Sequence, residues 1–209
     1  MIFGAVFGSK HSKEDYGAVM NYARITPPSV KENYVDIAGG DSSIDLTEAV
    51  GGVVFDDGKI SFKFTLFSAS DKDRMKNDLH GRKMKIVLER DRNFYYEGRL
   101  SFTGEKQSGN LYELQAEARV SPYKLESQVT VHNEEIKSPG KILLVNSRMP
   151  VMPTITVEGN ISISYAGTSV LLKTGTYEIP EFTLQDGINS LEVSGKGHVR
   201  IVYRKGELV

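Results

Sequence analysis

Apolar and polar residues alternate along much of the chain, and this pattern predicts β-strands. In residues 112–120 every second side chain is apolar, and each side chain between them carries a charge or an amide. Residues 60–66 show the same period, and residues 83–89 and 94–102 show it less strictly. A period of two is that of a strand with one buried and one solvated face. We therefore expect an antiparallel sheet that exposes one face to solvent.

The N-terminal segment predicts two further strands, at residues 2–7 and 19–25. Between them, residues 13–17 contain too few apolar positions for a long helix, so they predict a connecting turn. Pro27 and Pro28 then end the regular structure, because proline removes a backbone donor and restricts the residue before it.

Residues 33–66 predict a β-meander of three segments joined by two chain reversals. The first reversal is expected at Gly39–Asp41, where a positive φ costs least. The second is expected at Asp56–Lys59, because an Asp-Gly pair supplies the φ values that a tight hairpin needs. No part of this segment carries a recognisable catalytic motif.

One helix is expected, from Asp71 to His80, with Ser70 as its N-cap. Met75 and Leu79 are four residues apart and share one face, and Gly81 stands where a left-handed C-terminal residue belongs. The helix is short and mostly charged, so we expect it to cover one sheet and not to form a layer of its own.

The chain changes character at residues 121–123, and we place a domain boundary near residue 125. Beyond it the predicted strands are short and turns follow quickly, which favours a β-sandwich of jelly-roll type. The expected strands are residues 130–132, 141–145, 154–158, 161–165, 170–173, 176–179, 182–184, 190–193 and 199–203. The sequence Gly195–Gly197 predicts a hairpin tip between the last two.

Composition limits the classes of function. The chain has 209 residues, of which 39% are hydrophobic and 25% charged, and its formal net charge is −1. The length predicts one large or two small domains, and the balanced charge gives no global basic excess for nucleic acid or membranes. With no Cys, disulfides and thiolate sites are excluded. No leader and no apolar run of about 20 residues is recognised, so we expect synthesis in the cytoplasm.

Four carboxylates, Asp36, Asp41, Asp45 and Glu48, are the first candidates for a metal or an acid–base pair. A Ca²⁺ loop of EF-hand type requires a central glycine, and an aliphatic residue stands in that place. Hydrogen bonding within a turn is the favoured interpretation. A glycosidase pair would need two carboxylates held across a cleft, which spacing in sequence does not reveal.

The remaining chemical signals are weak. The histidines are scattered and form no zinc-binding pair, and the sequence contains neither a nucleophile elbow nor a phosphate-binding loop. Two basic segments, Arg82–Lys85 and Arg200–Lys205, favour solvated strand edges over a nucleic-acid groove. Tyr165, Tyr177 and Tyr203 are candidates for stacking on a carbohydrate, although packing in the core or at its rim is favoured.

A set of short stretches, spread in order along nearly the whole chain, matches a known family: Phe7–Gly17, Pro27–Pro28, Asn33–Ile37, Gly39, Asp41, Ser43, Asp45–Ala49, Leu79–Ile86, Tyr95–Arg99, Pro122–Lys124, Pro153–Gly159, Ser194–Gly197 and Arg204–Leu208. In these stretches the sequence resembles the distal tail proteins (Dit-like baseplate hub proteins) of long-tailed phages and prophages. The positions taken as family motifs are Tyr34, Gly39, Asp41, Asp45, Leu46, Thr47 and Gly81.

This resemblance implies a mainly β fold with two domains. Residues 1–125 would form a β-sandwich bearing one short helix and a β-hairpin, and residues 126–209 a galectin-like β-sandwich. It also implies a structural protein of the virion tail tip, made in the host cytoplasm, with no catalysis, cofactor or metal. Six copies would form a ring that meets the tail tube, tape-measure and tail-tip proteins, carries receptor-binding components and lets DNA pass without specific binding or membrane insertion.

Two alternatives stay open from the residues alone. The C-terminal sandwich could act as a carbohydrate-binding module in host recognition, and the scattered carboxylates could belong to a cell-wall glycosidase. The sequence does not distinguish an infective phage from a prophage or a tail-derived particle. It also leaves open which residues line the lumen or form the subunit contact, and whether rings stack.

Overall fold

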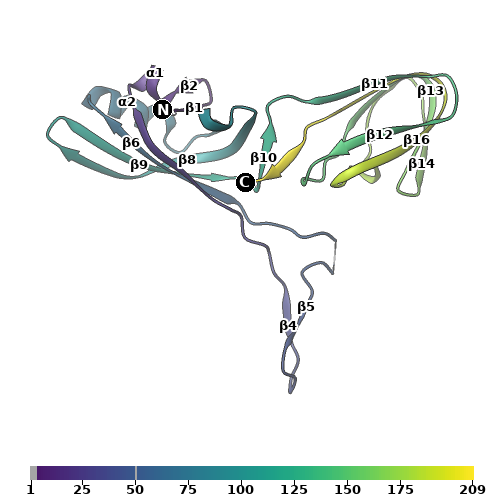
Figure 1. Ribbon diagram of the computed structural model, residues 1–209, viewed down its shortest axis with the longest axis horizontal. Helices are drawn as coiled ribbons and strands as arrows, with labels where there is room; N and C mark the ends of the chain where they lie inside the picture. The colour runs from purple at the N-terminus through teal and green to yellow at the C-terminus, as the bar shows by residue number, and fades with distance from the viewer. Residues whose placement is uncertain (1–3, 50) are drawn as a thin grey trace. The chain divides into compact units, whose positions relative to one another are not determined.

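The structure is a computed structural model that describes residues 4–49 and 51–209 and divides into two compact units (Figure 1). Unit 1 comprises residues 1–124 and 208–209, and unit 2 comprises residues 125–207. The last two residues thus return to unit 1, whereas the sequence had assigned the whole C-terminal end to the second domain. Of the first expected strand, Ile2 and Phe3 lie outside the described residues.

Unit 1 is an antiparallel sheet with two helices. In chain order it contains β1 (Ala5–Phe7), β2 (Lys10–His11), α1 (Ser12–Tyr16), β3 (Val19–Thr26), β4 (Tyr34–Asp36), β5 (Ser43–Asp45), β6 (Gly58–Leu66), α2 (Ala69–Leu79), β7 (Lys83–Leu88), the 3-10 helix η1 (Glu89–Asp91), β8 (Phe94–Ser108) and β9 (Leu111–Val120). The strands of the main sheet follow the order β2-β1-β7-β8-β9-β6-β3. The chain passes between the units at β10 (Tyr123–Glu126) and β17 (Gly206–Leu208). The mainly β prediction is confirmed.

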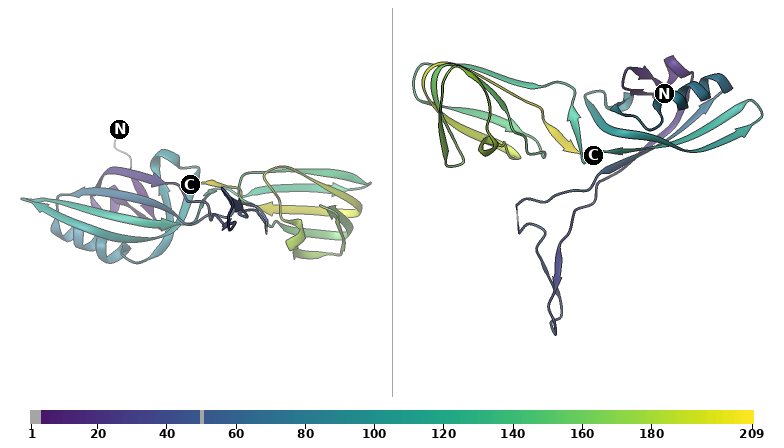
Figure 2. Two further views of the ribbon diagram at one scale, coloured as in Figure 1. Left: turned by 90° about the horizontal axis from the view of Figure 1, so that it is seen from below. Right: turned by 180° about the vertical axis from the view of Figure 1, so that it is seen from behind.

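The core of unit 1 lies between the sheet and the helices, which share one face of it (Figures 1 and 2). The alternation in residues 60–66 places Phe62 and Phe64 inward, and both are at most 1% exposed. The ring of Phe7 meets that of Phe62 edge-on, with 5.3 Å between the centroids. Met75 and Leu79 of α2 are buried against the same face, as their spacing predicted. Burying one such side chain stabilises the fold by about 1.5–3 kcal/mol.

Helix α2 confirms the expected helix but corrects its start. Its N-cap is Ser68, whose hydroxyl accepts a hydrogen bond from the Asp71 amide at 3.3 Å, and not Ser70. Ser70 instead lies inside the first turn. At the other end, Gly81 has a φ of 74°, so the expected left-handed residue is confirmed.

The connecting turn predicted at residues 13–17 is wrong, because a second short helix, α1, forms there. His11 acts as its N-cap: the Nδ1 atom accepts hydrogen bonds from the amides of Lys13 and Glu14, both at 3.2 Å. Gly17 closes the helix with a φ of 61°. Histidine is not among the usual N-cap residues, which is why the sequence pattern gave no helix signal.

A long insertion, residues 27–57, connects β3 to β6 and is called the arm. β3 and β6 are antiparallel neighbours in the main sheet, whereas β4 and β5 form a two-stranded sheet of their own. The expected turn at the arm's tip is confirmed, since Gly39 has a φ of 80°. The hairpin turn predicted at Asp56–Lys59 is wrong, because Gly58 is already a strand residue, buried opposite Val120 of β9.

Unit 2 is a curved antiparallel sheet. It contains β11 (Thr130–Ile136), β12 (Gly140–Asn146), β13 (Thr154–Tyr165), β14 (Thr168–Leu172), β15 (Gly175–Glu178), the 3-10 helix η2 (Pro180–Phe182) and β16 (Gly187–Tyr203). Its strand order is β11-β16-β13-β14, with β12 beside β16 and β15 beside β13. Its separate core includes Ile155, Ile163, Phe182, Leu191 and Ile201, all inaccessible to solvent.

The hairpin tip predicted at Gly195–Gly197 is wrong, since β16 continues through it. β16 pairs with β12 through its first half, with β11 through its second half, and with β13 along its middle and end. Gly195 and Gly197 have φ values of 119° and 149°, and Gly159, which pairs with Gly197, has 104°. A Cβ on Gly197 would lie 1.9 Å from the carbonyl oxygen of Glu158. These glycines therefore let two long strands bend while they stay paired.

Among the described residues, no helix is long and apolar enough to cross a membrane.

Candidate functional site

Within the described residues, the candidate functional features are two surfaces of unit 1, the arm and the outer face of the main sheet. Within residues 4–49 and 51–209, no group of three or more His, Cys, Asp or Glu side chains is arranged to hold a metal ion. Two of the four carboxylates singled out in the arm hold its local structure: Asp36 accepts a hydrogen bond from Ser43 at 2.6 Å, and Asp45 accepts one from the Thr47 amide at 2.9 Å.

The first surface is the outer part of the arm, residues 29–45. Every residue from 29 to 45 is exposed to solvent. The pairs Tyr34–Asp45 and Asp36–Ser43 lie on one side of the β4–β5 ribbon, because directly paired residues share a face and alternate residues repeat it. The other side presents the pair Val35–Ile44. The arm is therefore a ribbon with an acidic face and an aliphatic face.

The electrostatics of the acidic face follow from its close carboxylates. Asp45 and then Glu32 raise the pKa of Tyr34, because a phenolate beside negative charges is disfavoured. Hydrogen bonds from Thr47 lower the pKa of Asp45 by favouring its charged form. Asp45 is therefore charged at neutral pH.

The aliphatic face is unusual for a hairpin that does not pack on a core. Val35 and Ile44 are 46% and 49% exposed, and Ile37 beyond them is 50% exposed. An isolated two-stranded hairpin is at best marginally stable in water. Contiguous exposed apolar side chains on such an element are typical of a surface that another molecule covers.

The second surface is the outer face of the unit 1 sheet, opposite the helices. Lys59, Arg119, Arg99 and Lys83 belong to the neighbouring strands β6, β9, β8 and β7 and stand directly opposite one another in register. All four side chains are exposed. We call them the cationic row. Like charges directly opposite each other destabilise a sheet, so this arrangement has an energetic cost.

Carboxylates offset part of that cost at one end of the row. Lys59 pairs with Glu117 at 3.1 Å, and Arg119 pairs with Asp57 at 2.5 Å. At the other end Arg99 donates to the carbonyl oxygen of Gly81, and Lys83 forms no ion pair with any described residue. The row borders a shallow hollow of about 800 Å³. The sequence favoured a solvated strand edge for Arg82–Lys85, which is wrong, because β7 lies between β1 and β8 in the main sheet. The sequence pattern did not reveal the row, since its cations gather across strands and not along one strand.

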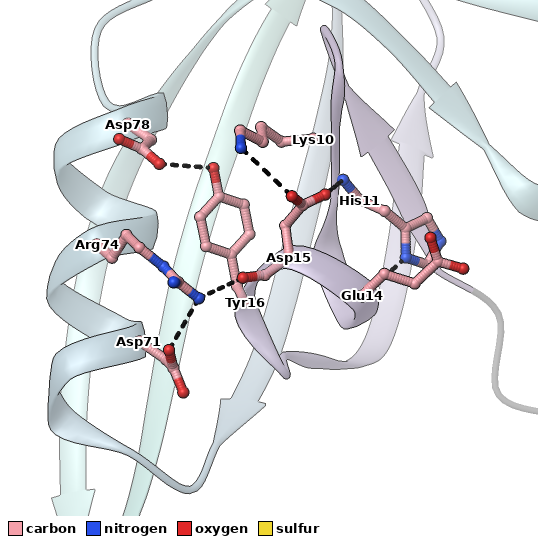
Figure 3. Close-up of polar contacts among 8 residues, drawn as sticks. All are labelled: Lys10, His11, Glu14, Asp15, Tyr16, Asp71, Arg74 and Asp78. Carbon is pink, nitrogen blue, oxygen red and sulfur yellow. Dashed lines mark hydrogen bonds and ion pairs between the residues drawn. The ribbon is translucent and has the colours of Figure 1, made fainter.

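A polar cluster between α1 and α2 links the two helices and has a structural role (Figure 3). The buried Tyr16 donates to the carboxylate of Asp78 at 3.1 Å, and burial together with this bond raises the pKa of Tyr16. Arg74 of α2 pairs with Asp71 at 2.9 Å and donates to the carbonyl oxygen of Asp15. These contacts tie α1 to α2.

The residues taken as family motifs gather in the arm. Tyr34 and Asp45 form one of its pairs, Gly39 and Asp41 lie at its tip, and Thr47 closes it. Leu46 also lies in the arm, where its amide donates to the Asn33 carbonyl at 2.7 Å. Gly81 lies apart, at the turn between α2 and β7.

The three tyrosines considered for carbohydrate binding do not form one site. Tyr203 is 4% exposed and donates to the Val145 carbonyl at 2.8 Å. Tyr165 donates to Asn189 at 2.6 Å and packs on Phe182, while the Tyr177 hydroxyl bonds the Lys173 carbonyl at 3.1 Å. Tyr165 is at the end of β13, whereas Tyr177 of β15 pairs with Ile155 near the start of β13, so the two rings lie far apart along that strand. Each ring thus contributes to packing and local hydrogen bonding.

The fold has a counterpart among solved structures. No family model and no curated protein matches the sequence. The crystal structure of the SPP1 Dit protein (gp 19.1), described as a paradigm of the hub adsorption apparatus in phages that infect Gram-positive bacteria, superposes with a TM-score of 0.72. The alignment covers 100% of both chains at 14% identity. The chain has a Dit-like fold. At this identity the likeness concerns the fold alone, and function is argued separately.

Proposed function

We propose that this protein is a structural component of a phage tail tip, in which six copies form a ring that joins the tail tube to the tail-tip or hub proteins. The observation that carries the proposal is the full-length match to the fold of a phage hub protein. Unit 1 forms the ring. Unit 2 is the galectin-like part to which receptor-binding components attach. The protein has no catalytic role, and DNA passes through the ring without specific binding.

The surfaces of unit 1 support this proposal. A ring needs one heterologous contact repeated by rotation, and the arm offers an exposed aliphatic face for it. The main sheet ends at β2 and β3, and end strands can add main-chain pairing between copies. The formal net charge of −1 limits repulsion between packed copies.

Ring formation can be tested by removing the aliphatic face of the arm. In the Val35→Ser/Ile44→Ser variant we expect an unchanged circular dichroism spectrum, since both side chains are already about half exposed, and a loss of the hexamer. Light scattering over a wide concentration range measures the mass, and electron micrographs of negatively stained particles show the ring.

The matched control is Val131→Ser/Leu171→Ser, which removes two exposed aliphatic side chains from unit 2. We expect this variant to assemble like the unchanged protein. If the unchanged protein is a monomer at every concentration, and purified tails lack it, the proposed function is wrong.

A further inference from the structure

The cationic row is an unusual arrangement for a sheet face that stays in water. Four cations oppose one another across four strands, and only the Lys59–Arg119 end has carboxylate partners. Paired cations have Cβ atoms about 4.5–5.5 Å apart, so their repulsion persists unless an anion lies over them. Acidic groups also line the hollow beside the row, among them Glu97 and Asp56. A surface of mixed charge fits a polypeptide better than a uniformly charged polyanion.

The same chain carries a segment of complementary charge. Residues 31–48 of the arm hold five carboxylates and one lysine, which gives a net charge of −4. Asp36 and Asp45 lie on one face of the ribbon, and Asp41 lies at its tip. The hydrogen-bond partners of Asp36 and Asp45 are within the arm itself. Neither the acidic face nor the exposed end of the row is therefore matched within one copy.

The arm is longer than the cationic row is wide. One limb, residues 28–39, contains twelve residues, and a strand of that length extends about 40 Å at roughly 3.3 Å per residue. That length exceeds the width of the row, which spans three inter-strand spacings, or about 14 Å at roughly 4.8 Å each.

We propose that the cationic row of one copy receives the acidic face of the arm of a second copy. Arg99 and Lys83 then meet Asp36 and Asp45, and Asp41 at the tip faces the hollow beside them. The inference rests on the proposed ring and adds the surface that receives the arm. It also makes assembly depend on salt, because the contact is largely between charges.

A charge exchange tests this contact. The row variant is Lys83→Glu/Arg99→Glu, and the arm variant is Asp36→Lys/Asp45→Lys. We expect each to raise the dissociation constant of the ring by about tenfold or more, because each sets like charges against each other. Combining all four substitutions restores opposite charges, so most of the affinity should return.

Raising the salt from about 0.1 M to about 1 M should weaken the unchanged ring, as the Debye length falls from about 10 Å to about 3 Å.

Two controls separate this contact from other effects of charge. Lys137→Glu/Lys141→Glu reverses two exposed cations of unit 2 and changes the net charge by the same amount. It should leave the dissociation constant unchanged. Asp36→Asn/Asp45→Asn keeps hydrogen-bond acceptors in the hairpin. A rise in the dissociation constant of the ring in this variant therefore reports the lost charge and not an unfolded arm.

Crosslinking locates the contact directly, because the natural chain has no cysteine. An Asp41→Cys chain is mixed with a Ser101→Cys chain, whose new thiol borders the hollow. The disulfide between the Asp41→Cys and Ser101→Cys chains should form several times faster than the one between the Asp41→Cys chain and a Ser190→Cys chain, whose thiol is on unit 2.

The outcomes distinguish the two proposals. Intact rings in the row and arm variants, with equal crosslinking to Ser101→Cys and Ser190→Cys, would overturn the inference and leave the ring in place. Absence of a ring in the unchanged protein would overturn the proposed function, and the inference with it.

Discussion

Single side chains decide where helix α1 begins and how it is joined to α2. His11 replaces the usual Ser, Thr, Asp or Asn at an N-cap, and its Nδ1 atom must be unprotonated to accept two amide hydrogen bonds. Asp15 then accepts from the His11 amide at 2.7 Å, which lowers the pKa of that carboxyl. Tyr16, the last residue of α1, carries the bond to Asp78 that joins the two helices (Figure 3).

Replacing Tyr16 by phenylalanine should change both stability and its dependence on pH. Loss of the bond to Asp78 should cost about 1 kcal/mol near neutral pH. Burial raises the pKa of Tyr16 above the ordinary value of 10.0. The folded state therefore keeps the hydroxyl proton to a higher pH than the unfolded state does. Stability is therefore full below about pH 10 and is lost as the pH rises further.

Denaturant unfolding between neutral pH and pH 11 measures this effect. The Tyr16→Phe variant should lose stability less steeply above pH 10, by up to about 1.4 kcal/mol per pH unit. Some slope should remain, because burial also raises the pKa of Tyr96 and Tyr203. An identical slope in the two proteins would show that Tyr16 ionises without cost.

At the scale of elements, β13 and β16 differ most from the strands that the sequence predicted, and both differences have one physical cause. β16 and β13 are each continuous where glycines suggested turns, because the partner strand supplies backbone hydrogen bonds on both sides of each bend. The arm shows the reverse: its strands have β-forming sequence but stay outside the main sheet, since β3 and β6 already fill the positions beside each other.

A Cβ added at the bend of β16 should be costly. In Gly197→Ala the new atom would lie 1.9 Å from the Glu158 carbonyl oxygen, at a φ of 149° that L residues rarely adopt. We expect a loss of at least about 3 kcal/mol in the stability of unit 2. Gly140→Ala is the matched control, because its nearest atom lies 3.9 Å away, and it should change stability by less than about 1 kcal/mol. Chemical denaturation followed by circular dichroism measures both.

At the scale of the whole molecule, each unit has its own core and its own fold. The buried cluster around Phe62 belongs to unit 1, and the cluster around Ile163 belongs to unit 2. Domains with separate cores unfold as separate cooperative units unless a large interface couples them. The two units can therefore differ in stability while sharing one chain.

Differential scanning calorimetry should resolve two unfolding transitions. Phe62→Ala should lower one of them by the equivalent of about 3–5 kcal/mol, and Ile163→Ala should lower the other by about 2–5 kcal/mol, because each leaves a cavity in a packed core. A single transition that both substitutions lower equally would show that the units unfold together.

The sequence by itself determined the strand content, helix α2 and the inward-facing residues of β6 and β9, because these depend on local periodicity and capping. It did not reveal α1, whose cap is an atypical histidine, or the continuity of β16 through Gly195 and Gly197. Only the tertiary structure decided that Lys59, Arg119, Arg99 and Lys83 form one row, since cross-strand register unites residues far apart in sequence. The same holds for the arm: its composition suggested ordinary strands, and only the pairing of β3 with β6 left its acidic and aliphatic faces without a partner.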